Sequence, residues 1–167
     1  MKFFLAYLAF ALIFLVIEST LFHSLPPPLI PDVILIMAFY LGFTHRSTFG
    51  AFTVFILGYA ADIFSAGIIG TSSFTLVFVF AVTSLLARII SLNSLLVKIG
   101  GTIFMSILKG ILTYMVLRFL NQEIPFYIIF PAAASTGIVS PFIFTLLKKI
   151  TLRVRAVGYS TVEKIEL

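Results

Sequence analysis

The sequence predicts an all-α, polytopic integral membrane protein with about six transmembrane helices in a compact bundle. The first observation is the composition, with 61% hydrophobic and 10% charged residues, whereas soluble domains are about 45–50% apolar and about 25% charged. The second is that the apolar residues form long runs, many of them near the roughly 20 residues that a helix needs to cross the hydrocarbon core. The third is the placement of Lys and Arg between these runs, which orients the helices.

Charges, prolines and glycines divide the chain into predicted spans at residues 3–22, 29–43, 48–64, 71–87, 97–120 and 125–147. Several spans are near the lower length limit, which leaves tilted helices, a thinned bilayer and partly re-entrant hairpins open. A signal peptide is the alternative for the first span, but it lacks a small-x-small cleavage site, so we interpret it as a transmembrane helix. Residues 1–150 then form one transmembrane domain, and residues 151–167 form a basic cytoplasmic tail.

The basic residues predict that both termini lie in the cytoplasm. With this number of spans, every Lys and Arg falls on the cytoplasmic side except Lys109, inside a span, and Arg118, near the outer surface. An odd number of spans would split the basic loops between the two sides of the membrane, which the positive-inside rule disfavours. The net charge of +5 therefore indicates topology and does not indicate nucleic-acid binding. We expect the basic start of the tail to contact anionic membrane lipids, and docking of a cytoplasmic partner is the alternative.

Three ionisable residues are predicted to lie within the outer half of the membrane. A rise of about 1.5 Å per residue from the cytoplasmic helix ends places Glu18, Asp62 and Lys109 there. Because a charge at a helix centre costs roughly 2.5–3.5 kcal/mol, such residues need partners or water. We expect Asp62 to form an ion pair or polar cluster with Lys109, or with Arg118 near the outer surface. Whether this pairing is structural or forms a binding site stays open.

Asp32 has a different expected role. The proline-rich stretch at 23–32 is predicted to be a stiff connector outside the membrane. Pro31 then begins the second helix, where the carboxylate of Asp32 can accept hydrogen bonds from free amide groups and meet the positive end of the helix dipole.

Small residues predict close contacts between helices. The fifth span carries a polar stripe that recurs at helical spacing and should face protein. Its residues are Thr102, Ser106, Lys109, Gly110 and Thr113. Gly67 and Gly70 are expected to let the chain turn, after which a Ser or Thr caps the fourth helix. The residues expected at helix contacts are Gly50 and Gly58 in the third span, Ser106 and Gly110 in the fifth, and Gly137 in the sixth.

No catalytic or cofactor-binding pattern accompanies these residues. The sequence contains no cysteine, which excludes thiolate metal sites and cysteine nucleophiles. It also contains no His-Glu-x-x-His metal motif, no phosphate-binding Gly-x-x-x-x-Gly-Lys and no Gly-x-Ser-x-Gly nucleophile motif. We therefore expect a protein that is not an enzyme and holds neither a metal nor a cofactor.

The layout resembles the family of the bacterial rod-shape-determining protein MreD. The residues that carry the resemblance are Pro31-Asp32 at the start of the second helix, Gly50 to Gly58 along the third, Gly58-x-x-x-Asp62 at its end, and Ile68-Ile69-Gly70 before the fourth. The resemblance covers about residues 1 to 150. The family often has Pro-Leu-Gly where this chain has Ile68-Ile69-Gly70.

The resemblance implies a non-enzymatic scaffold in the bacterial inner (cytoplasmic) membrane. Proteins of this family work with the bitopic protein MreC, the actin-like MreB filament, and the glycan polymerase and transpeptidase of cell-wall elongation. The resemblance also implies that one polar region shapes a surface that binds a partner helix. The residues of this region are Glu18, Asp32, Asp62, Lys109 and Arg118. The alternative is a solute (vitamin)-binding membrane subunit of an energy-coupling-factor transporter, although Ala6, Ala9 and Ala11 lack the Ala-x-x-x-Ala spacing usual in that group.

Overall fold

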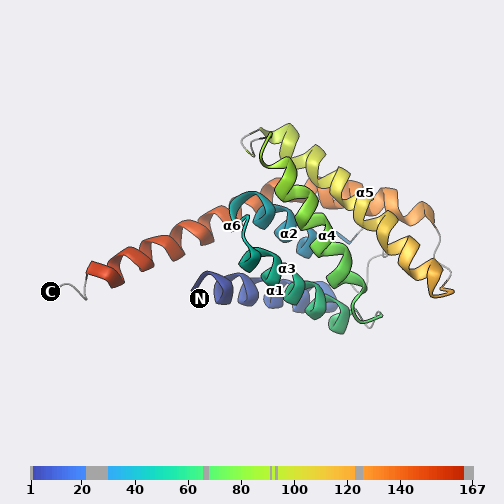
Figure 1. Ribbon diagram of the computed structural model, residues 1–167, viewed down its shortest axis with the longest axis horizontal. Coiled ribbons are helices and arrows are strands. Elements are labelled where there is room, and N and C mark those ends of the chain that lie inside the picture. The colour runs from blue at the N-terminus through green and yellow to red at the C-terminus, as the bar shows by residue number, and fades with distance from the viewer. Residues whose placement is uncertain are drawn as a thin grey trace.

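The computed structural model describes residues 2–21, 30–65, 68–90, 92, 94–122 and 126–163. This part of the chain is helical throughout its regular structure, as the sequence predicts (Figure 1). Its elements are α1 (Lys2–Leu21), α2 (Val33–Thr44), α3 (Thr48–Phe64), α4 (Thr71–Leu86), α5 (Leu95–Phe119), a short 3-10 helix η3 (Phe126–Ile128) and α6 (Ile129–Glu163).

The helices differ widely in length. At a rise of about 1.5 Å per residue, the 12 residues of α2 cover about 18 Å and the 25 residues of α5 about 37 Å. Among the described residues, the segments Leu95–Phe119 and Phe126–Arg153 are long and apolar enough to cross a membrane, and the other helices are shorter apolar ones. Helix α6 continues without interruption past the predicted domain boundary at residue 150 and ends at Glu163.

Helix α2 forms the centre of the molecule. Residues 33–42 are all buried, and α2 packs against α1, α3, α4, α5 and α6. A helix that is hydrophobic on every side is stable only where other elements cover all of its faces. Helix α5 is far less covered by other helices, because only Thr102 and Met105 among its 25 residues are buried.

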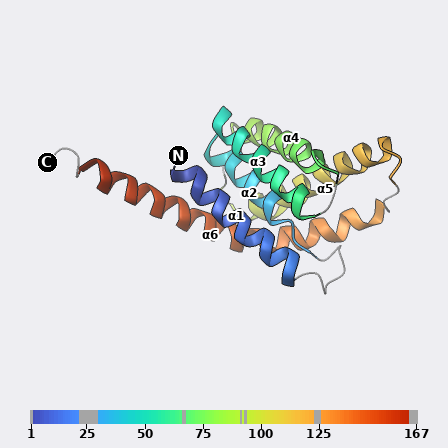
Figure 2. The ribbon, with the colours of Figure 1, turned by 90° about the horizontal axis from the view of Figure 1, so that it is seen from below.

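The remaining helices pack around α2 mainly as two pairs. Helix α3 packs along α4, and α5 packs along α6. Helix α1 begins and α6 ends at the same end of the molecule (Figure 1; Figure 2). At the opposite end, the α5 and α6 pair extends beyond the ends of α1, α3 and α4 in both views.

The glycines singled out in the sequence lie at close helix contacts. A Cβ atom on Gly58 would lie 2.5 Å from the Cα atom of Ser73, so no larger residue fits between α3 and α4 without moving a backbone. A Cβ atom on Gly110 would lie 2.6 Å from a methyl carbon of Ile129, between α5 and α6. Gly50 lies against the His45 carbonyl and the Phe80 ring, and Gly137 lies against the side chain of Ile103.

Candidate functional site

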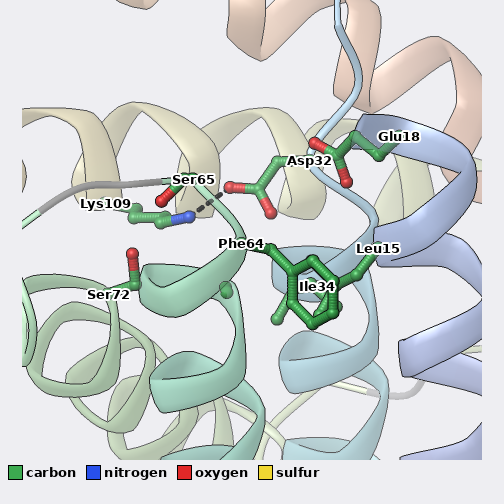
Figure 3. A pocket seen from close by; sticks show the side chains of 9 residues that line it. Leu15, Glu18, Asp32, Ile34, Phe64, Ser65, Ser72 and Lys109 are labelled. Atoms are coloured by element: carbon green, nitrogen blue, oxygen red, sulfur yellow. Dashed lines mark hydrogen bonds and ion pairs between the residues drawn. The ribbon is translucent and has the colours of Figure 1, made fainter. Parts of the chain in front are cut away.

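Polar side chains from five helices meet where α1 and α3 end and where α2 and α4 begin. They line a hollow of about 210 Å3 (Figure 3), which we call the polar cavity. Its apolar wall comes mainly from α1, α2 and the end of α3. The lining residues are Leu15, Glu18, Asp32, Ile34, Ala61, Phe64, Ser65, Ser72 and Lys109.

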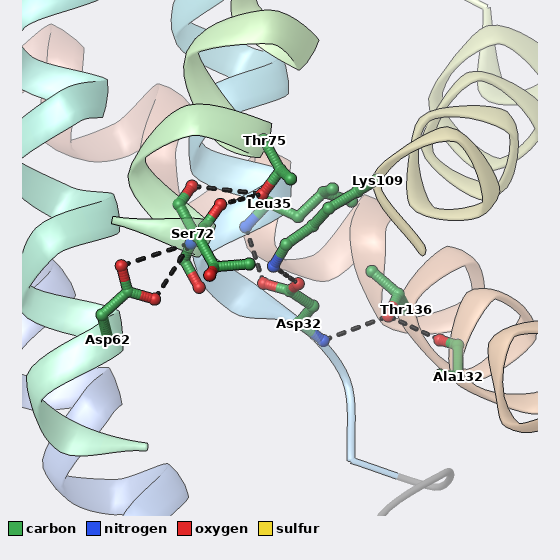
Figure 4. A network of polar contacts seen from close by, with 9 residues as sticks. Asp32, Leu35, Asp62, Ser72, Thr75, Lys109, Ala132 and Thr136 are labelled. Carbon is green, nitrogen blue, oxygen red and sulfur yellow. Dashed lines mark hydrogen bonds and ion pairs between the residues drawn. The ribbon is translucent and has the colours of Figure 1, made fainter. Parts of the chain in front are cut away.

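Asp32 and Lys109 form an ion pair in this cavity (Figure 4). Asp32 is the N-cap of α2, and its Oδ1 accepts a hydrogen bond of 2.8 Å from the backbone N–H of Leu35. Its Oδ2 accepts from the Nζ of Lys109 in α5. The side chain of Asp32 is 29% exposed and that of Lys109 is 18% exposed, so the pair is partly shielded from the surroundings. The expected capping role of Asp32 is therefore present, with the helix beginning at Val33, two residues later than expected.

Asp32 also ties α2 to α6. Its backbone N–H donates to the Oγ1 of Thr136 at 3.0 Å. The same hydroxyl donates to the carbonyl of Ala132 within α6 at 2.7 Å. Because its backbone, both carboxylate oxygens and its lysine partner are all engaged, Asp32 fixes the mutual positions of α2, α5 and α6.

Asp62 does not form the ion pair that the sequence predicts, and this is a correction. Among the described residues, its carboxylate contacts neither Lys109 nor Arg118 and instead binds backbone amides at the start of α4. The N–H of Gly70 donates to Oδ2 at 2.8 Å, and the N–H of Ser72 donates to Oδ1 at 3.0 Å. The side chain is 2% exposed. A carboxylate at this position also meets the positive end of the α4 dipole.

The turn before α4 explains why Asp62 is needed there. Gly70 is the N-cap of α4 and has a φ of 101°, which favours glycine, and glycine has no side chain with which to cap a helix. The expected cap by a Ser or Thr is absent at this position. Asp62 supplies the acceptor from α3 instead, so one residue closes the α3–α4 turn and satisfies two amides.

Glu18 and Arg118 occupy different environments. Glu18 is half-buried and lines the polar cavity, on the opposite side of Asp32 from Lys109 (Figure 3). Among the described residues, its carboxylate has neither a hydrogen-bond donor nor an ion-pair partner. Arg118 is exposed in the last turn of α5, about 13 Å further along the axis than Lys109. Arg118 is therefore not part of the cluster that the sequence predicts.

A second cavity lies on the other side of the ion pair, between α5 and α6. Its volume is about 190 Å3, and it shares Asp32 and Lys109 with the polar cavity. The polar stripe of α5 lines it from Ser106 to Thr113, as expected for a stripe that faces protein. The lining residues are Asp32, Ser106, Lys109, Gly110, Thr113, Tyr114, Ile128, Ile129, Ala132 and Thr136.

A third hollow, the α3–α4 groove, has a volume of about 420 Å3. The hydroxyl of Ser73 is buried beside it and has no hydrogen-bond partner among the described residues. Sequence reasoning missed this groove, although small side chains at helical spacing along α4 were a signal for it. The lining residues are Phe55, Gly70, Ser73, Phe74, Val77, Phe78 and Ala81.

The chemistry that the polar cavity offers is recognition of charge. It presents a lysine ammonium group, two carboxylates and two serine hydroxyls beside an apolar wall. No protein-family model matches the chain, and neither a curated protein nor a solved structure matches it.

Proposed function

We propose that this protein is a multi-pass scaffold of the bacterial inner membrane, of the MreD type, that binds MreC. In this role it helps to couple the MreB filament to the glycan polymerase and transpeptidase of cell-wall elongation, and so to maintain rod shape. The proposal rests on the sequence resemblance and on one structural observation that supports a partner helix, the α3–α4 groove.

The apolar exterior of the helices supports the membrane placement. Large hydrophobic side chains point outward on the helices that surround α2, for example Phe52 at 57%, Phe74 at 58% and Ile138 at 75% exposed. Soluble monomers seldom expose apolar patches of more than a few hundred Å2. Polar residues such as Thr75, Thr102 and others are buried instead. In a membrane, lipid acyl chains would cover this apolar exterior, so that it is not exposed to water.

The positions of the helix ends support an even number of crossings. Helix α1 begins and α6 ends at the same end of the molecule (Figure 2). This arrangement fits the topology in which both termini are cytoplasmic. The polar cavity and the turn before α4 then belong to the outer half of the membrane.

The α3–α4 groove supports the binding of a partner's transmembrane helix. Small residues along α4, such as Ser73 and Ala81, let a second helix backbone approach closely. Phe55 and Phe78 border the groove and can pack against that helix. The proposed occupant is the single transmembrane helix of MreC.

Filling the groove tests this proposal. Ala81→Leu adds bulk in the groove, so it should reduce co-purification of MreC in mild detergent by at least about tenfold, equivalent to roughly 1.4 kcal/mol. Ala134→Leu is the matched control, because Ala134 is an exposed alanine on α6, away from the groove. Full recovery of MreC with a correctly inserted Ala81→Leu protein would rule out this surface. Charge reversal at Asp62 is less informative, because Asp62 closes the α3–α4 turn.

A solute-binding transporter subunit is the second candidate function. The observation that favours it is the polar cavity, with charged groups of both signs beside an apolar wall. Affinity isolation in mild detergent, followed by mass spectrometry of the bound proteins, separates the two candidates. Recovery of MreC and cell-wall synthases supports the scaffold. Recovery of transporter ATPases, together with tight vitamin binding by the purified protein, supports the carrier.

A further inference from the structure

We propose that the polar cavity binds a zwitterionic group, in which an anionic oxygen group and a primary ammonium group belong to one molecule. The anionic group would bind Lys109, and the ammonium group would bind Glu18. The inference rests on the membrane placement proposed above. It does not depend on MreC binding or on transport.

The lysine end of the cavity has hydrogen-bond donors to spare. A lysine ammonium carries three N–H donors, and Asp32 is the acceptor for Lys109 among the described residues. The side chains of Ser65 and Ser72 lie on the same side of the cavity as the ammonium group (Figure 3). The hydroxyl of Ser72 makes no hydrogen bond within the described part of the chain. A phosphate or carboxylate oxygen would accept from Lys109 and from this hydroxyl.

Asp32 keeps its own contacts when a ligand oxygen binds Lys109. Its Oδ1 accepts from the amide of Leu35 and its Oδ2 accepts from Lys109, so both oxygens are engaged in holding the helices. Binding of an anionic oxygen to the free donors of Lys109 leaves these contacts in place.

The glutamate end of the cavity has an acceptor group that lacks a donor. The carboxylate of Glu18 faces the cavity with no donor among the described residues, and Asp32 lies between it and Lys109 (Figure 3). Leu15 and Phe64 form the apolar surroundings on this side. A primary ammonium group supplies both the donors and the charge that this carboxylate lacks.

A zwitterion fits the cavity better than a simple ion. A lone anion would leave the Glu18 carboxylate without a partner, and a lone cation would leave the donors of Lys109 unused. Partly buried charges without partners are costly. A neutral molecule that bears both charges serves both ends and enters an apolar environment with less loss of hydration than a net charge.

Two sources carry this chemistry: the phosphoethanolamine headgroup of a membrane lipid and a free small zwitterion. The second cavity favours the lipid, because it adjoins the polar cavity at Asp32 and Lys109 and is lined by apolar residues such as Ile128 and Ile129. An acyl chain can lie there while the headgroup occupies the polar cavity.

Lipid binding to the purified, delipidated full chain tests the proposal. Native mass spectrometry in detergent would compare phosphatidylethanolamine, phosphatidylcholine and phosphatidylglycerol with identical acyl chains. We expect phosphatidylethanolamine to bind about tenfold or more tightly than the other two, because only its headgroup combines a phosphate with a primary ammonium. Soluble glycerophosphoethanolamine that binds as tightly as the lipid would identify the free zwitterion as the source. Equal retention of the three lipids overturns the proposal.

Two variants identify the site. Glu18→Gln should remove the preference for phosphatidylethanolamine, and it disturbs no contact among the described residues. Arg118→Gln is the control, because it removes a charge from an exposed residue that lines neither cavity. A folded Glu18→Gln protein with unchanged lipid preference also overturns the proposal. If MreC capture fails while the lipid preference persists, only the scaffold function is refuted.

Discussion

Asp32 and Asp62 lie at the same end of the molecule and are stabilised in different ways. Asp32 begins α2 and shares its charge with Lys109 and one backbone amide. Asp62 lies in the last turn of α3 and binds two backbone amides at the start of α4. The more deeply buried of the two is Asp62, the one without a cation.

A buried acid in an apolar chain therefore does not need a basic side chain as its partner. The first amides of a helix have no partner within that helix, and they carry part of the positive end of the dipole. Two such amides satisfy Asp62, for which the sequence predicted a contact with Lys109 or Arg118. Lys109 is thereby left for Asp32, which joins three helices, whereas Asp62 joins only α3 to α4.

Removal of the cation that pairs with Asp32 should destabilise the protein most. Lys109→Met should lower the free energy of unfolding by about 2–4 kcal/mol, somewhat below the roughly 3–5 kcal/mol of a fully buried pair, because both side chains are partly exposed. Thermal unfolding in detergent measures this change. Adding Asp32→Asn should restore part of the loss, and a double variant as unstable as the sum of the two single ones would contradict the pairing.

The second effect tests whether Asp62 acts independently of Lys109. Asp62→Ala leaves the amides of Gly70 and Ser72 without their acceptor and should cost about 2–3 kcal/mol. In a double-mutant cycle with Lys109→Met, the two losses should add within about 0.5 kcal/mol. A coupling energy as large as that of Asp32 with Lys109 would show that Asp62 and Lys109 do interact.

The third effect concerns the helix contact that Asp62 holds together. Gly58→Ala places a methyl group 2.5 Å from the Cα atom of Ser73, so α3 and α4 must separate, at a cost of about 1–3 kcal/mol. Gly100→Ala is the matched control, because nothing lies within 4 Å of its Cβ position. That control should stabilise α5 by about 0.5–1 kcal/mol. Equal thermal stability of the two variants would contradict the close α3–α4 contact.

The smallest effect is expected at Arg118. This exposed residue has no ion-pair partner among the described residues, and its contact with the end of the α5 dipole is weak. Arg118→Gln should change the free energy of unfolding by less than about 0.5 kcal/mol. A loss comparable to that of Lys109→Met would show that Arg118 belongs to the polar cluster after all.

Much of the local structure follows from the sequence. The apolar runs predict the helices well, and the third predicted span has the same bounds as α3, Thr48–Phe64. The placement of Glu18, Asp62 and Lys109 toward one end of the molecule also follows, because distance along a helix axis grows by a fixed rise per residue. Helix capping by Asp32 is equally local, since acceptor and amide are three residues apart.

The pairing of these charged groups was decided by the tertiary structure. Position along a helix axis does not specify which neighbour a side chain meets, because that depends on how each helix is rotated and which helices surround it. For the same reason the sequence did not place α2 at the centre, although its apolar residues on every side are what a central helix requires. The helices and the level of each charge along them follow from the sequence alone. Packing around α2 decides that Lys109 meets Asp32 while Asp62 binds the amides of α4.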